Sequence, residues 1–404
     1  MSEPTSPPPT VGPRVVLDHQ SATPLLPEVR AAMEPFLGAD FGNPSSLHRL
    51  GLWARDALDT AREQVAAFVN ARSPGDVLFT SDGTESANLA VKGVAWAVRR
   101  RAGHLVVSAT EHPAVIQSVA FLESHGFTAT RVGTDAEGIV DPAAVGAAIT
   151  RETVLVALHH ANHDTGAIQP CAEVGRLAAK AGAPFFVDAE SSAGWLPLDV
   201  QAMGAGLMSF SPHRFGGPRG VGVLVRDARV KLASLIHGGA QEGGLRAGVE
   251  NVAAIVGAGV ACEIASKQRS NRAANAARLQ EKLWRGVQSA VARVQLNGPA
   301  PGPGRLPSNL NVSVEATEGE GLMLLLDFQG VAVSGGTICA SKELRTSPVL
   351  QAMGIGHARA QAAVIVSFGP PSTEADVDRF LEVFPGVVAK LRAMSPQWDE
   401  GRMG

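Results

Sequence analysis

The chain has 404 residues, 45% of them hydrophobic, so it is long enough to bury a full core and to divide into two domains. Its net charge of −3 is spread along the sequence, and the basic run 99–101 is typical of the polar end of a helix, which argues against a nucleic-acid partner. The longest apolar stretch, Val252 to Cys262, is too short to cross a bilayer, so we expect no membrane partner.

The first residues and the cysteines bear on the compartment. The proline-rich start, residues 1–13, lacks the apolar region of a signal peptide and predicts a disordered tail on a cytoplasmic protein. Cys171, Cys262 and Cys339 are widely spaced and form no CxxC pair. This spacing argues against a disulfide framework or a zinc module, so a cysteine with a function would act as a thiol.

Between residues 77 and 225, short β-rich runs alternate with amphipathic helical stretches. The predicted strands are 77–80, 105–108, 153–157, 185–188, 207–210 and 221–225. Because these runs are apolar on both faces, they predict a mainly parallel sheet covered by helices on both sides. Several runs end in polar residues, and ligands bind at the carboxyl ends of strands in an open α/β sheet. The sequence therefore predicts one site at this edge.

After about residue 250 the pattern changes. A long helical stretch, roughly Asn251 to Val291, is followed by the strand Asn309–Val314 and two further helices, which indicates a smaller α+β domain. We therefore predict a large domain over 14–260 and a small C-terminal domain over 261–404. The N-terminal segment of the large domain can also pack with the small one.

Three segments near strand ends carry polar side chains suited to a ligand. The turn Ser81–Asn88 offers backbone N–H groups and the Thr84 hydroxyl to a phosphate, or simply caps a helix. His112 can stack on a flat ring or be a structural histidine. In the run His159–Gly166, Asn162 can hydrogen-bond a ring hydroxyl, and the three histidines suit a metal or a polar loop.

Three further segments complete the set. Asp188 ends an apolar strand, where a buried carboxylate needs a cationic partner such as a protonated pyridine nitrogen. The glycines and prolines of Ser209–Gly220 indicate a tight backbone turn. The small-residue loop Val333–Ser341 presents Cys339, either a buried small hydrophobe or a nucleophile.

In this order and at these separations, the six segments resemble the NifS/IscS cysteine desulfurases of the class V aminotransferase superfamily, from about Val16 to Phe384. Three more segments support the resemblance: Asp18–Pro24, Phe41–Ser46 and His237–Glu242. The resemblance implies an α/β fold of the fold-type I pyridoxal-phosphate (PLP) transferases, with a smaller C-terminal α+β domain. It also implies a homodimer in which Gly238–Gly248 reaches toward the partner's site.

The resemblance assigns roles to the site residues. Those that would hold the cofactor phosphate, named the cradle residues below, are Gly83, Thr84, Ser211 and His213. His112 would stack on the cofactor ring, Asn162 would face its hydroxyl, and Asp188 would pair with the pyridinium nitrogen. Cys339 would accept sulfur as a persulfide.

Several family positions differ in this chain. The Schiff-base lysine falls on Arg214, and a guanidinium with a pKa above ~12 stays charged and cannot form the internal aldimine. The arginine that holds the substrate carboxylate falls on Ile365. Asp82 replaces a glycine of the phosphate site, Val249 a threonine and Ser191 a glutamine. We therefore expect a degenerate PLP site, in which Arg214 and Asp82 form an ion pair.

Three functions follow from these residues. The first is a desulfurase-like protein without PLP catalysis, in which Cys339 carries sulfur or ligates an iron–sulfur cluster together with a scaffold or sulfur-acceptor protein. The second is an active cysteine desulfurase that holds PLP non-covalently or through Lys342. The third is a pocket reworked to bind a metal or another anion. Its candidate ligands are His112, His163, Asp188, His213 and Cys339, with Arg214 as an anion fork.

Overall fold

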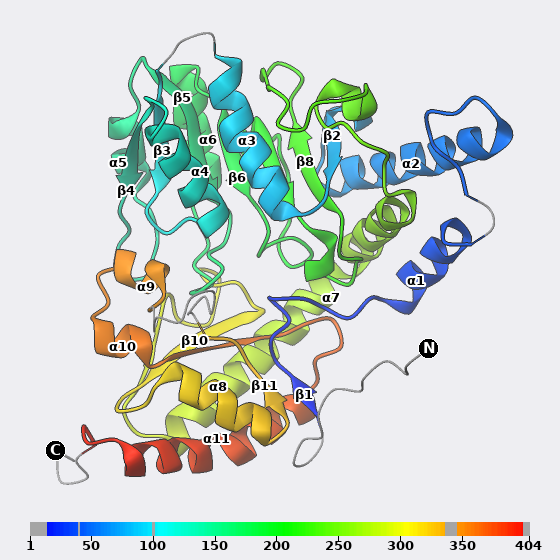
Figure 1. Cartoon of the computed structure of the whole chain (residues 1–404). Coiled ribbons are helices and arrows are strands. Elements are labelled where there is room, and N and C mark those ends of the chain that lie inside the picture. The colour runs from blue at the N-terminus through cyan, green and yellow to red at the C-terminus, as the bar shows by residue number, and fades with distance from the viewer. Residues whose placement is uncertain (1–13, 39–40, 99–101, 336–345, 399–404) are drawn as a thin grey trace.

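The structure, a computed structural model, describes residues 14–38, 41–98, 102–335 and 346–398. The predicted tail 1–13, Cys339 and Lys342 lie outside the described residues. A large sheet with its helices lies above a smaller part that contains two small sheets (Figure 1). In the part of the chain that the structure describes, no helix is both long and apolar enough to span a membrane.

The large sheet has seven strands in the order β2-β8-β7-β6-β5-β3-β4. They are β2 (Val77–Thr80), β3 (His104–Ser108), β4 (Thr128–Val132), β5 (Thr153–His159), β6 (Phe185–Asp188), β7 (Leu207–Phe210) and β8 (Gly222–Arg226). Only the pairs made by β8 are antiparallel, so the predicted mainly parallel sheet and its six predicted strands are confirmed. The edge strand β4 was not predicted, because it is largely exposed and its sequence TATRV has no apolar run.

Helices cover both faces of this sheet. They are α2 (Arg49–Phe68), α3 (Gly83–Ala97), α4 (Pro113–Glu123), α5 (Pro142–Ala148) and α6 (Cys171–Ala181), whereas α1 (Pro27–Met33) packs against the long helix described below. On β3, Leu105 and Val107 face the core formed with α3 and α4, whereas Val106 faces the core formed with α2, α5 and α6. This alternation follows from the two-residue period of a strand, and it buries both faces as predicted.

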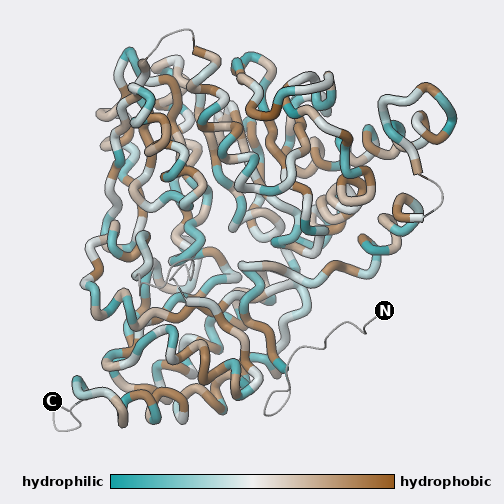
Figure 2. The backbone as a smooth tube through the Cα atoms, in the orientation of Figure 1, coloured by the Kyte–Doolittle hydropathy of each residue, from teal (hydrophilic) through white to brown (hydrophobic). Residues whose placement is uncertain are grey.

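The smaller part contains a three-stranded antiparallel sheet, β12-β10-β9, and a parallel pair, β1-β11. Its strands are β1 (Val15–Val16), β9 (Val294–Leu296), β10 (Asn309–Val314), β11 (Val331–Ala332) and β12 (Ala363–Ser367). Its helices are α8 (Gly319–Phe328), α9 (Pro348–Ala352), α10 (His357–Gln361) and α11 (Glu374–Met394). Because β1 pairs with β11, the N-terminal segment packs here. Hydrophilic stretches lie between the two parts (Figure 2).

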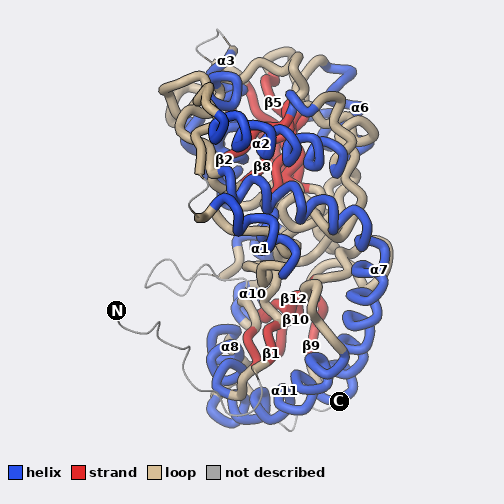
Figure 3. Tube along the Cα trace, turned by 90° about the vertical axis from the view of Figure 1, so that its right-hand side faces the viewer, coloured by secondary structure: helices blue, strands red, loops and turns tan. Residues whose placement is uncertain are grey.

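One helix, α7 (Val252–Ala290), belongs to both parts and confirms the predicted long helix. Its N-cap, Asn251, accepts a hydrogen bond from the Ala254 N–H at 3.3 Å. Ile255 packs in a core of the large sheet, and Leu283 packs in the core of the smaller part. Figure 3 shows the helix running along one side of the molecule past both. The predicted boundary between residues 260 and 261 falls inside this helix, so the division into two domains stays a prediction.

A buried ion pair anchors the segment 238–248 to the rest of the large part. The side chain of Glu242 is 2% exposed, pairs with Arg62 at 2.7 Å and accepts a hydrogen bond from the Phe79 N–H at 2.9 Å. Glu242 has a φ of 48°, a left-handed conformation that destabilises a residue with a Cβ. These contacts therefore stabilise a strained turn. The approach of this segment to a partner's site stays a prediction.

Replacing Glu242 by alanine (Glu242→Ala) should lower the free energy of unfolding by about 3–5 kcal/mol, because it leaves the Arg62 charge without its partner. The matched control is Glu173→Ala, since Glu173 pairs with Arg176 at 3.9 Å with both side chains exposed. Because Glu173 also lies in the first turn of α6, the control should change stability by up to about 1 kcal/mol. Urea unfolding of both variants measures the difference, and equal losses would contradict the role of the buried pair.

Candidate functional site at the carboxyl ends of the strands

The central strands bring the predicted site residues to one edge of the sheet. In register, His159 of β5 lies beside Asp188 of β6, which lies beside Ser209 of β7. The segments that follow these strands therefore meet, as the sequence predicts. His159 itself is held by Glu111, whose Oε1 is 2.9 Å from its Nδ1.

Glu190, two residues past Asp188, lies at the centre of this edge. Its Oε1 accepts a hydrogen bond from the Ser211 hydroxyl at 3.0 Å. The same carboxylate lies so close to Gly83 that a Cβ added there would collide with it. Glu190 therefore lies against two of the four cradle residues.

Arg214 ends the short helix η3 (Pro212–Arg214), and its Nε lies 3.8 Å from Oε2 of Glu190. This distance makes an ion pair but is too long for a hydrogen bond. The predicted pair between Arg214 and Asp82 is wrong. Asp82 is instead the N-cap of α3, where its Oδ1 accepts a hydrogen bond from the Glu85 N–H at 2.7 Å. A helix N-terminus offers a carboxylate a free N–H group and a favourable dipole, which explains this alternative.

The two neighbouring carboxyl groups are in a poorly solvated place. Burial is the largest cause that raises the pKa of Glu190; Asp188 and Asp82 raise this pKa further, whereas Arg214 lowers it. Burial also raises the pKa of Asp188, which accepts a hydrogen bond from the Glu190 N–H at 3.0 Å. With both carboxyls ionised, one guanidinium faces two negative charges. The pair therefore keeps a proton at higher pH than ordinary carboxyl groups do.

Two histidines near Arg214 are neutral at neutral pH. The rings of His112 and His163 meet edge to face, with centroids 5.1 Å apart. Burial is the main cause that lowers the pKa of each to about 3, and Arg214 contributes. His112 also caps α4, because its Nδ1 accepts a hydrogen bond from the Ala114 N–H at 3.1 Å. This bond fixes Nδ1 without a proton.

Asn162 is buried, and its side-chain amide is hydrogen-bonded to other groups of the chain. The Nδ2 group donates to the Thr110 carbonyl at 3.0 Å. The Oδ1 atom accepts hydrogen bonds from the N–H groups of Asp164 and Thr165, both at 2.9 Å. Asn162 therefore holds its own loop in place, and its contact with a ring hydroxyl stays a prediction.

A small cavity of about 10 Å³ lies beside Arg214 and Glu190, room for about one water molecule. In the described ranges, no group of three or more His, Cys, Asp or Glu side chains is placed to hold a metal ion. The histidines and Asp188 proposed as metal ligands therefore do not form such a group with one another. This finding gives the metal hypothesis no support from the described residues.

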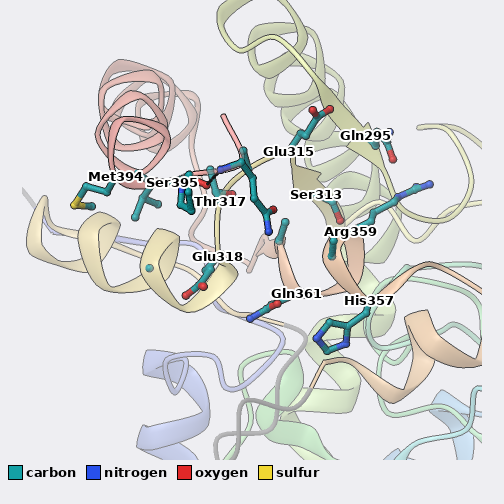
Figure 4. A pocket seen from close by; sticks show the side chains of 17 residues that line it. Gln295, Ser313, Glu315, Thr317, Glu318, His357, Arg359, Gln361, Met394 and Ser395 are labelled. Atoms are coloured by element: carbon teal, nitrogen blue, oxygen red, sulfur yellow. Dashed lines mark hydrogen bonds between the residues drawn. The ribbon is translucent and has the colours of Figure 1, made fainter. Parts of the chain in front are cut away.

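A larger cavity, of about 690 Å³, lies in the smaller part between α8, α10 and the end of α11 (Figure 4). Polar side chains from its walls include Glu318, His357 and Arg359. Arg359 is already bound to the protein, since its Nε donates to Asn297 Oδ1 at 3.0 Å. None of the lining residues belongs to the strand-end site, so this cavity is not the candidate site.

Residues 15–380 match the family described as aminotransferase class-V. The chain is 40% identical over 389 residues to the cysteine desulfurase IscS of Dictyoglomus turgidum, covering 96% of this chain and 98% of that protein. It is 41% identical over 388 residues to the cysteine desulfurase IscS of Anaeromyxobacter dehalogenans, covering 95% of each. This chain belongs to the IscS/NifS cysteine desulfurase family.

Solved structures agree with that family. A NifS-like protein superposes with a TM-score of 0.87 at 34% identity, over 93% of this chain and 100% of that one. A structure described as SspA in complex with cysteine has a TM-score of 0.77 at 32% identity, over 89% of this chain and 100% of that one. The predicted α/β fold of the PLP-dependent desulfurases is therefore confirmed.

The structure also places the other predicted residues of this desulfurase-family chain. Thr84 is exposed in the first turn of α3, whereas His213 is half-buried in η3. Burial, followed by Arg214, lowers the pKa of His213 to about 4. Ile365 is 4% exposed in β12 of the smaller sheet, where its backbone bonds to Ser334. The structure thus brings Gly83, Ser211 and His213 near Arg214, and Ile365 comes from the smaller part.

Glu190 is a residue of the candidate site that the sequence motifs do not single out. The signal is a second acid two residues beyond Asp188, after a buried strand, where a polar side chain must find a partner. Its direction toward Ser211 depends on the turn after β6, which residue spacing does not predict. The sequence therefore shows that an acid is present at position 190, but it does not predict that this acid lies against the cradle residues.

The substitution Glu190→Gln should become more stabilising as the pH rises. Because the pKa of Glu190 is raised in the folded state, its protonated form stabilises the fold below its ordinary value of 4.5, and this stability is lost as the pH rises through the folded-state pKa. A folded-state pKa that is higher by one corresponds to about 1.4 kcal/mol. Thermal unfolding from pH 4.5 to 8 should show a growing gain for the variant, with Glu173→Gln as the surface control. A gain that shrinks with pH would show that the pairing with Arg214 dominates.

Proposed function

We propose that this member of the cysteine desulfurase family does not hold PLP as an internal aldimine, and that it acts in sulfur transfer or iron–sulfur assembly through Cys339. The observation that carries the proposal is Arg214 in η3, a guanidinium 3.8 Å from Glu190 at the edge where the family's lysine is expected. A neighbouring carboxylate favours the charged form of a guanidinium. The side chain therefore offers no amine to an aldehyde.

The residues around Arg214 support the same conclusion. PLP would supply an electron sink for breaking the carbon–sulfur bond of cysteine. The residues present do not fit a covalently held cofactor, since no amine stands at position 214 and Glu190 lies against the cradle. The expected substrate clamp is Ile365, an apolar side chain without the paired N–H donors that hold a carboxylate. We therefore assign no chemical step to PLP.

Cys339 is the cysteine best suited to carry sulfur. Cys171 and Cys262 are buried, and burial raises the pKa of both thiols, which disfavours the reactive thiolate. The thiolate of Cys339 would attack the outer sulfur of a persulfide on a donor protein. The donor's S–S bond breaks, a new one forms at Cys339, and the donor leaves as a thiolate, so no oxidant is needed. A thiolate also suits an iron–sulfur cluster shared with a scaffold protein.

The alternative is an active cysteine desulfurase. It is favoured by the identity of 40% over almost the full length of the IscS protein of Dictyoglomus turgidum. It requires PLP held without a covalent bond, or an amine from elsewhere, for which Lys342, three residues past Cys339, is the candidate. The homodimer implied by the family is compatible with either function.

Borohydride reduction separates the two functions. The protein, produced with PLP in excess, should show no yellow aldimine band, and peptide mapping after reduction should find no pyridoxyl group on any lysine, because Arg214 cannot form the adduct. The variant Lys342→Ala is the matched control. A pyridoxyl adduct on Lys342 that this variant loses, together with sulfide release from free cysteine, would establish the active enzyme.

Transfer of labelled sulfur tests Cys339. After incubation with an active desulfurase loaded from labelled cysteine, the wild type should retain the label and Cys339→Ser should lose almost all of it, because the acceptor thiolate is gone. Cys171→Ala and Cys262→Ala, which change buried thiols, should keep it. Equal labelling of Cys339→Ser and wild type would contradict the assigned role.

A further inference from the structure

We propose that the carboxyl group of Glu190 occupies the cradle, where it takes the place of a phosphate group and excludes ligands that carry one. This inference goes beyond the proposed function, because it concerns the anion site and requires nothing of Cys339. It rests on three features of the described residues: a hydrogen bond, a close approach and a balance of charge.

The hydrogen bond occupies the donor that a phosphate would need. Ser211 is fully buried, and its hydroxyl donates to Oε1 of Glu190 at 3.0 Å. A serine hydroxyl has a single proton to donate. While Glu190 accepts it, a phosphate oxygen at this position has no donor from Ser211.

The close approach leaves no space beside the turn that opens α3. Glu190 lies against Gly83 so tightly that even one added carbon atom would collide with its carboxylate. That added carbon would also lie only 2.9 Å from the Ser211 hydroxyl. The volume between these two cradle residues is therefore filled by the chain itself.

The balance of charge favours the carboxylate over a phosphate dianion. Arg214 supplies one positive charge beside Glu190, at 3.8 Å. Asp82, at the N-cap of α3, and Asp188 both raise the pKa of Glu190, so the surroundings already disfavour a single negative charge. Each like charge about 5 Å from an incoming phosphate weakens binding by roughly a few hundredfold for every negative charge of the phosphate, at an effective dielectric near 20. A phosphate from solution could therefore bind only if the side chain of Glu190 moved out of the cradle.

The first experiment measures binding of inorganic phosphate by calorimetry to wild type, Glu190→Ala and Asp82→Gly/Glu190→Ala. Wild type and the surface control Glu173→Ala should not bind measurably. Glu190→Ala should bind at least about thirtyfold more tightly than the wild-type limit, and the double variant should bind more tightly still, since one like charge is removed at each step. Adding Ser211→Ala to Glu190→Ala should abolish the gain, which distinguishes the cradle from a freed Arg214 that binds any anion.

Two outcomes overturn the inference. One is a wild type that binds phosphate as tightly as Glu190→Ala. The other is a folded Glu190→Ala and a folded Asp82→Gly/Glu190→Ala that both fail to bind, since then something other than Glu190 closes the cradle. Neither outcome depends on the sulfur label at Cys339, so this inference and the proposed function fail separately.

The second experiment uses PLP itself as the probe. Arg214→Lys restores an amine but leaves Glu190 in the cradle, so borohydride reduction should give little pyridoxyl adduct at position 214. Arg214→Lys/Glu190→Ala should give at least about tenfold more adduct by peptide mapping, because the cradle is open to the phosphate. Equal amounts of adduct in the two variants would overturn the inference.

Discussion

Buried carboxylates require a cation nearby, and this requirement organises the strand-end site. Asp188 and Glu190 are two residues apart at the end of β6, and Arg214 places its guanidinium next to the second of them. Without Glu190, Arg214 would lose its ion pair and keep only the attraction of other carboxylates such as Asp188, and Glu190 without the arginine would be a second like charge beside Asp188. The charge of each residue therefore offsets the desolvation cost of the other.

The contacts that hold the fold do not involve the residues of the candidate site. The sheet is held by apolar strand residues that face cores on both sides, and the segment 238–248 is held by the buried pair of Glu242 and Arg62. None of these contacts involves Arg214, Glu190 or Ile365. A TM-score of 0.87 against a NifS-like protein therefore reports on the fold and does not test the pocket.

Much of the fold could be predicted from the sequence, because buried strands and long helices leave strong patterns. All six predicted strands of the large sheet and the helix α7 are present, whereas the edge strand β4 is too polar to leave a pattern. The site was harder to predict. The residue spacing brings Asp188 and Ser211 to one edge, but it does not reveal that Asp82 would bond to its own helix, or that Glu190 would turn toward Gly83. Those outcomes depend on the competition between local partners, which residue order alone does not decide.

Because α7 is one continuous helix, it couples the stability of the two hydrophobic cores. Ile255 lies in one core and Leu283 in the other, on a single rod of hydrogen-bonded backbone. If the smaller part melted alone, the second half of this helix would lose the tertiary packing that supplies most of its stability. Fraying would then travel toward the large sheet. A destabilising substitution in the core of the smaller part, far from the strand ends, can therefore affect the candidate site through α7, which both parts share.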